Sequence, residues 1–151
     1  MMLAPDAERI LVGYLLDVAE LVPLVDGRIY TAVPANPTFP LLRVHRWGGV
    51  PPYSQTLEWD VASVQVDVWG GPKQTALQAA ETARAALSEM HLTDPACRRV
   101  IFGPLSVGWD DDYTPPKPRV RFDMDVTVRR VPPADPDPEP SLFVDTFEEM
   151  F

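Results

Sequence analysis

The sequence predicts an α+β domain: a mixed or antiparallel sheet of about five strands, with two helices packed on one face and an extended C-terminal arm. Strand-like segments outnumber helical ones, and their order along the chain is α-β-β-β-α-β-β. A strand at 60–69 is followed by the stop Gly70-Gly71-Pro72 and an alanine-rich helical segment at 73–90. The chain has 151 residues, which suits one domain that buries about two thirds of its unfolded surface.

The segment 119–130 carries the clearest strand pattern, because apolar and polar residues alternate along it. Its apolar positions are Val120, Phe122, Met124, Val126 and Val128, and its polar ones include Arg119, Arg121, Asp123 and Asp125. A period of two indicates a half-buried antiparallel strand with one face in water. Charges of both signs on that wet face exceed what solubility requires. We therefore predict that it contacts other surfaces.

The other elements follow from capping and breaking residues. Asp6 is the expected N-cap of an amphipathic helix that Pro23 ends. Short strands are expected at 28–33 and 39–47, and a fourth strand at 98–107. The Gly/Pro-rich stretch 48–55 and the stretch 109–116 are expected to be loops.

The C-terminal segment has a different composition, which divides the chain into a domain at 1–130 and an arm at 131–151. Residues 131–140 alternate acids with prolines, a pattern that favours an extended, semi-rigid spacer. The end of the arm is apolar, and one helical face would carry Phe143, Phe147 and Met150, with Phe151 beside them. A spacer with an aromatic tip is typical of a docking arm.

Charge and cysteine content limit the function classes. The net charge is −9, most of it from the six acidic residues of the arm, so the chain is not expected to grip nucleic acid. The single cysteine, Cys97, allows no intrachain disulfide, and a buried, inert thiol is the favoured interpretation. No secretory signal or membrane-spanning stretch is expected.

The sequence offers no motif for catalysis or cofactor binding, so we predict neither an enzyme nor a cofactor or metal. His45 and His91 lack partners at metal-ligand spacing. The run Asp110-Asp111-Asp112 lacks the spacing of a calcium loop, which favours a solvated acidic loop. Aromatic side chains are the better candidates, because Trp and Tyr are enriched at protein contacts. The predicted interface aromatics are Trp47 with Tyr53 and Trp109 with Tyr113.

Several segments together resemble the tail terminator (tail completion, head–tail joining) proteins of long-tailed bacteriophages. The resemblance spans about residues 6–130 and rests on four segments after the opening helix: Asp26-Gly27-Arg28-Ile29-Tyr30, Phe39 to Val44, Gln65-Val66-Asp67-Val68-Trp69 before the alanine-rich helix, and the Arg-x-Arg-x-Asp alternation of Arg119 to Asp125. The arm departs from this pattern.

The resemblance implies a virion protein at the junction of tail and neck, assembled in the host cytoplasm. Such subunits form a hexameric ring that caps the tail tube, ends its polymerisation and joins the tail to the neck. The implied partners are further copies of the chain, the tail tube protein and a neck connector protein, while DNA passes through the lumen without specific binding. The polar face of the last strand would then meet a neighbouring subunit or line the channel. The loops with Trp47 and Trp109 would contact tube or neck.

Two alternatives remain open. One is a head–tail neck connector protein of the same fold, located between portal and terminator. The other belongs to a different class, a small-ligand binding module or an enzyme of unknown reaction, whose residues would converge only in three dimensions.

Overall fold

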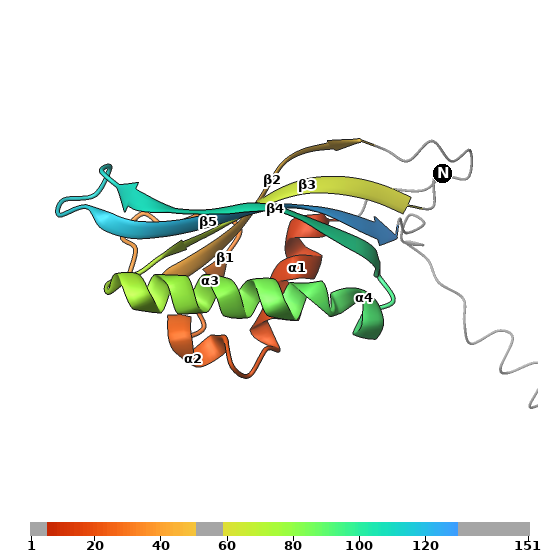
Figure 1. The fold of residues 1–151 in the computed structure, drawn as a ribbon, viewed down its shortest axis with the longest axis horizontal. Helices are drawn as coiled ribbons and strands as arrows, with labels where there is room; N and C mark the ends of the chain where they lie inside the picture. The colour runs from red at the N-terminus through yellow and green to blue at the C-terminus, as the bar shows by residue number, and fades with distance from the viewer. Residues whose placement is uncertain (1–5, 51–58, 130–151) are drawn as a thin grey trace, which may run out of the picture.

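The computed structural model of the chain describes residues 6–50 and 59–129 (Figure 1). Its elements in chain order are α1 (Ala7–Leu16), α2 (Val22–Val25), β1 (Ile29–Tyr30), β2 (Leu41–Val50), β3 (Trp59–Trp69), α3 (Lys73–Ser88), α4 (Met90–Thr93), β4 (Cys97–Asp110) and β5 (Lys117–Arg129). This arrangement confirms the predicted α+β class, with the short helices α2 and α4 as additions. The arm at 131–151 lies outside the described residues.

The five strands form one mixed sheet in the order β1-β2-β3-β5-β4. Within the described parts of the chain, only β1 pairs in parallel, through Ile29 and Tyr30, and the remaining strand pairs are antiparallel. The helices α1, α2, α3 and α4 lie on one side of the sheet in Figure 1. Among residues 6–50 and 59–129, no helix lies on the opposite side, and we call that side the open face.

The strand β5 confirms the alternation read from the sequence. Its five apolar side chains are all buried on the helix side: Val120, Phe122, Met124, Val126 and Val128. It pairs with β3 and β4 along its two edges, so it lies inside the sheet. The buried valines of β3 continue the same core, which explains why this strand tolerates so many β-branched residues.

The helix α3 packs closely on β3 and β5 because its buried face consists mainly of alanine. Ala76, Ala80 and Ala83 are fully buried there. Gly70 makes the tight entry to this helix possible, since a Cβ at Gly70 would lie 2.9 Å from the Ala76 Cβ. The predicted helix to residue 90 instead ends at Ser88, and α4 begins at Met90.

The first helix differs from its prediction. Asp6 is the N-cap, because its side chain accepts a hydrogen bond from the Arg9 backbone N–H at 3.1 Å. However, α1 ends at Leu16, and Pro23 lies in the first turn of α2 instead of ending a single long helix. Proline suits a first turn, where its missing N–H costs no hydrogen bond. The intervening turn allows Leu21 to reach the core.

Three strand boundaries also differ from the prediction. The strand predicted at 28–33 has only two paired residues. By contrast, β2 extends into the predicted connection as far as Val50, and β4 extends to Asp110. The pairing of β2 with β3 shifts between Arg46 and Gly48, which leaves Trp47 as an extra, bulged residue. The glycines Gly48 and Gly49 suggested a loop here, but their pairing with β3 keeps this part of β2 in the sheet.

Candidate assembly surfaces

The open face carries polar side chains of β5, and four of them, Arg119, Arg121, Asp123 and Asp125, have partners within the same chain. The register places Asp125 opposite Ser63, whose hydroxyl donates a hydrogen bond to it at 2.8 Å. Asp123 lies opposite Gln65 and accepts from its side-chain amide at 3.2 Å. The predicted contact residues are thus brought together, but as a cross-strand network.

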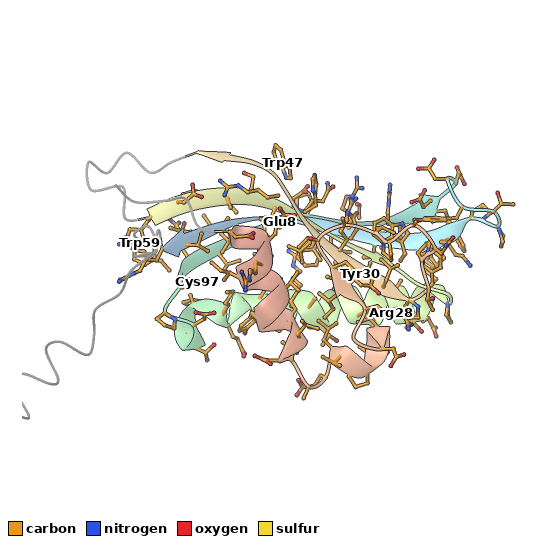
Figure 2. The ribbon with its side chains drawn as sticks, turned by 180° about the vertical axis from the view of Figure 1, so that it is seen from behind. Glu8, Arg28, Tyr30, Trp47, Trp59 and Cys97 are labelled. Carbon is orange, nitrogen blue, oxygen red and sulfur yellow. The ribbon has the colours of Figure 1, made fainter. Side chains whose placement is uncertain are left out.

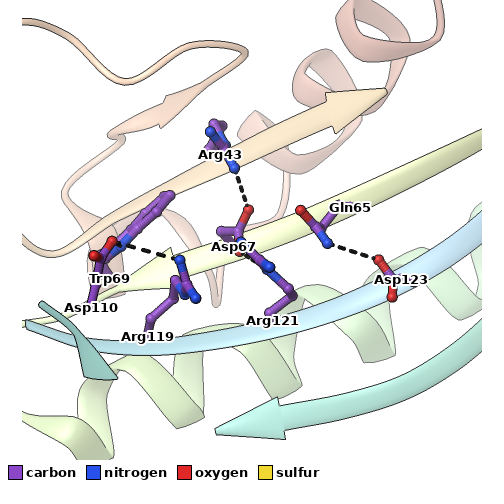
Figure 3. A network of polar contacts seen from close by, with 8 residues as sticks. All are labelled: Arg43, Gln65, Asp67, Trp69, Asp110, Arg119, Arg121 and Asp123. Carbon is purple, nitrogen blue, oxygen red and sulfur yellow. Dashed lines mark hydrogen bonds and ion pairs between the residues drawn. The ribbon is translucent and has the colours of Figure 1, made fainter. Parts of the chain in front are cut away.

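Asp67 is the centre of this network, as Figure 3 shows. Its side chain is fully buried on the open face, between Arg43 of β2 and Arg121 of β5. The Arg43 Nη2 donates to one carboxylate oxygen at 2.7 Å, and the Arg121 Nε donates to the other at 2.5 Å. Two charge-assisted hydrogen bonds are what makes a buried carboxylate tolerable. Arg43 also lies over the Trp69 ring, 5.3 Å from its centroid.

Asp110 extends the network to the end of β4. The Trp69 indole N–H donates to its Oδ2 at 2.8 Å, and the Asp112 backbone N–H donates to its Oδ1 at 3.0 Å. The Arg119 Nη1 lies 3.7 Å from the same carboxylate. Burial alone raises the pKa of Asp110, because it disfavours the charged carboxylate. The two hydrogen bonds and nearby guanidinium charges outweigh this effect, so its pKa lies below the ordinary value of 3.8.

The three aspartates 110–112 therefore do not form one solvated loop. Asp110 is a buried residue of β4, and only Asp111 and Asp112 lie in the turn to β5. Among residues 6–50 and 59–129, no group of three or more His, Cys, Asp or Glu side chains is arranged to hold a metal ion. Cys97 is buried, and burial is the main cause that raises its pKa to about 11.

Trp47 and Trp109 are both exposed, by 63% and 57%, but the structure does not bring them together. Figure 2 shows Trp47 projecting from the sheet on the side away from the helices. Trp109 pairs with Pro118, in phase with the buried Val120, so it belongs to the helix side of the sheet. Tyr113 packs edge-on against Phe39, with ring centroids 5.0 Å apart.

The remaining predicted interface residues fall outside the described residues. Tyr53 lies in the segment 51–58, and the others lie in the arm: Phe143, Phe147, Met150 and Phe151.

The two edges of the sheet are features that the sequence did not reveal. The long strand β4 forms one edge and exposes Ile101 by 49% and Val107 by 44%. At the other edge, β1 pairs with Leu42 and Arg43 only, so beyond Arg43 the side of β2 that faces away from β3 has no strand partner among the described residues. Unpaired edges are templates for a strand from another chain. The signal in the sequence was the poor alternation of β4, but strand order was needed to interpret it.

Comparisons with known proteins agree with this architecture. The family model described as Tail completion protein gp17 matches residues 9–129. Among the solved structures, a chain from the "Virion of native gene transfer agent (GTA) particle" has a TM-score of 0.61 and 18% sequence identity, covering 83% of this chain and 98% of that one. No curated protein matches the sequence. No helix in the described ranges is long and apolar enough to cross a bilayer.

Proposed function

The chain belongs to the family of Tail completion protein gp17 and is a structural virion protein of a phage-type tail, and from this premise we propose that it forms a ring capping the tail tube. The ring, a hexamer by the resemblance described above, ends tube polymerisation and joins the tail to a neck connector protein. The proposal assigns separate surfaces of the domain 1–130 to neighbours, lumen and partners.

The proposal of a ring rests on the two sheet edges that have no strand partner among residues 6–50 and 59–129. The two edges differ from each other, because one is the long strand β4 and the other is the part of β2 beyond Arg43, which β1 does not cover. Contact between unlike surfaces is head-to-tail, and such contacts give closed rings when the rotation per subunit closes. We therefore propose that β4 of one subunit meets β2 of the next.

The open face then lines the lumen. Its carboxylates Asp67, Asp123 and Asp125 already have partners in the same chain, so they are not needed for pairing between subunits. Its arginines Arg119 and Arg121 lie beside carboxylates, which lowers their attraction for phosphate. DNA can pass such a wall without being held.

The two ends of the sheet supply contacts above and below the ring. The turn between β4 and β5, with Trp109 beside it, lies at the opposite end from the last residues of β2 (Figure 1). One end meets the tail tube protein and the other the neck connector protein. Large exposed aromatics such as Trp109 are suited to anchor such contacts. The arm at 131–151 would dock on a neighbouring subunit.

The ring is tested by light scattering and negative-stain imaging of the purified full chain, alone and mixed with tail tubes. Rings that cap one end of each tube support the proposal. A monomer that ignores tubes at high concentration would refute it, and rings that bind only neck protein would assign the chain to the neck.

Two variants test the assigned surfaces. Val107→Lys places a charge on the β4 edge, and we expect it to abolish rings while leaving the monomer folded. Trp109→Ala should keep rings but weaken tube capping. Leu92, 73% exposed on α4, provides the matched control, since Leu92→Lys and Leu92→Ala should change neither property.

A further inference from the structure

Four arginines gather around one end of the sheet, where β4 begins and β5 ends. Arg98, Arg99 and Arg129 are exposed there, and Arg84 of α3 lies over Phe102, further along β4 on the helix side of the sheet. Within the described residues, no carboxylate lies within ion-pairing distance of any of the four, because the ion pairs involve Arg28, Arg43, Arg46, Arg119 and Arg121. The net charge of the chain is −9, yet the part of it that the structure describes supplies no acidic partner for the positive charge at this site. We call these four residues the arginine cluster.

Aromatic rings hold three of these guanidinium groups in place. Arg98 and Arg129 both lie over Trp59, with their Cζ atoms 5.3 Å and 5.1 Å from its ring centroid. Arg84 lies 5.0 Å from the Phe102 ring centroid. Figure 2 shows Trp59 at the end of the sheet far from the β4–β5 turn. A stacked guanidinium keeps its N–H donors available in its plane, which suits carboxylate recognition.

Apolar surface lies beside the cluster on the same stretch of β4. Ile101 is half exposed on the open face, and on the helix side Phe102 lines a hollow of about 330 Å³ with Ala85 and Ser88. The site therefore combines positive charge with places for apolar side chains on the faces of β4, beside the edge that the ring contact uses. A ligand that complements it is acidic, extended and apolar at one end.

The arm at 131–151 has this chemistry. It contains six acidic and no basic residues, and its tip is aromatic. Asp135, Asp137 and Glu139 alternate with prolines, which in an extended polyproline chain spaces them by roughly 6 Å. A ten-residue spacer of this kind reaches roughly 30 Å.

We propose that the arm of one subunit docks on the arginine cluster of a neighbouring subunit and clamps the ring. The acids contact the cluster, and the apolar tip covers the adjacent β4 surface. The neighbour is the acceptor because Arg129 itself belongs to the cluster, and Val131-Pro132-Pro133 favours a chain that leads away from it. This inference rests on the proposed ring.

The test uses the full chain with a photo-crosslinking benzoylphenylalanine at Phe147, assembled with an excess of isotope-labelled chain without the probe. We expect crosslinks to labelled peptides that contain residues 97–110, identified by mass spectrometry. Crosslinks only within the probe's own chain, or only to other elements, would overturn the proposal. Imaging of the same samples separates the two inferences: intact rings with misplaced crosslinks refute only the clamp, whereas absent rings refute the proposed function.

Charge reversal tests the role of the cluster. Arg98→Glu with Arg99→Glu should lower the crosslink yield at least about tenfold. Arg9→Glu with Lys73→Glu changes the net charge equally at exposed residues outside the cluster and should leave the yield unchanged. Adding Asp135→Arg and Asp137→Arg to the cluster variant should restore the yield. An unchanged crosslink yield in the cluster variant contradicts the proposal, and so does a folded double-reversal protein in which the yield is not restored. If the Arg98→Glu, Arg99→Glu variant unfolds, Arg98→Gln with Arg99→Gln takes its place.

Discussion

Trp69 donates its indole N–H to Asp110 at 2.8 Å, although the strands that carry them are not neighbours. The hydrogen bond links β3 to β4 across β5, beside Arg119 of that middle strand. Asp110 therefore holds the far end of the sheet together and fixes the start of the turn to β5, which the proposed function assigns to a partner contact.

Asp110→Asn should destabilise the protein at pH 7 by about 1–3 kcal/mol, because it removes a charge-assisted acceptor. The folded-state pKa of Asp110 is lowered, so its contribution is complete above the ordinary value of 3.8 and is lost as the pH falls through the lowered value. Urea unfolding of both proteins from pH 7 down to about pH 2 should show the difference shrinking toward acid. Asp111→Asn, on an exposed neighbour, should have little effect. A difference that stays constant with pH would contradict this account.

Asp67→Ala should destabilise the fold by about 3–5 kcal/mol, because Arg43 and Arg121 lose the carboxylate that neutralises them. Asp125→Ala removes only an exposed hydrogen bond to Ser63 and should cost less than about 1 kcal/mol. Chemical denaturation of the two variants makes the comparison. If both variants lost the same free energy of unfolding, the burial of Asp67 between its arginines would make no difference to stability.

Gly49→Ala should be strongly destabilising. Gly49 has φ 142°, and a Cβ there would lie 2.3 Å from the Val61 carbonyl oxygen, so the bulged end of β2 has to move away from β3. We expect a loss of about 1–3 kcal/mol. Gly48→Ala meets no atom within 4 Å and serves as the matched control in thermal unfolding. If the two variants have the same melting temperature, the close approach of Gly49 to the Val61 carbonyl oxygen does not limit stability.

Cys97 should resist alkylation in the folded protein. Its pKa of about 11 lowers the thiolate fraction at pH 8 by roughly a hundredfold relative to an ordinary thiol, and burial adds to this protection. Iodoacetamide labelling followed by mass spectrometry should be slow in buffer and fast in denaturant. Rapid labelling of the native chain would show that the start of β4 opens readily.

The sequence predicted what depends on local periodicity and missed what depends on strand order. The alternation along β5 placed Phe122 and Met124 in the core, and this was confirmed. Asp67 was recognisable only as a polar residue in a strand, because the arginines that bury it belong to two other strands. Trp47 and Trp109 were each predicted as interface residues of a loop, yet both lie in strands, and pleat and bulge place them on different faces of the sheet.

The position of β5 has a consequence for synthesis of the chain. This strand follows β3 and β4 in sequence but lies between them in the sheet. Until β5 has left the ribosome as far as Arg129, β3 and β4 both lack their principal partner. The sheet of the nascent chain therefore cannot be completed. Folding is delayed until translation has passed this point, which keeps incomplete chains from joining an assembly before they can complete it.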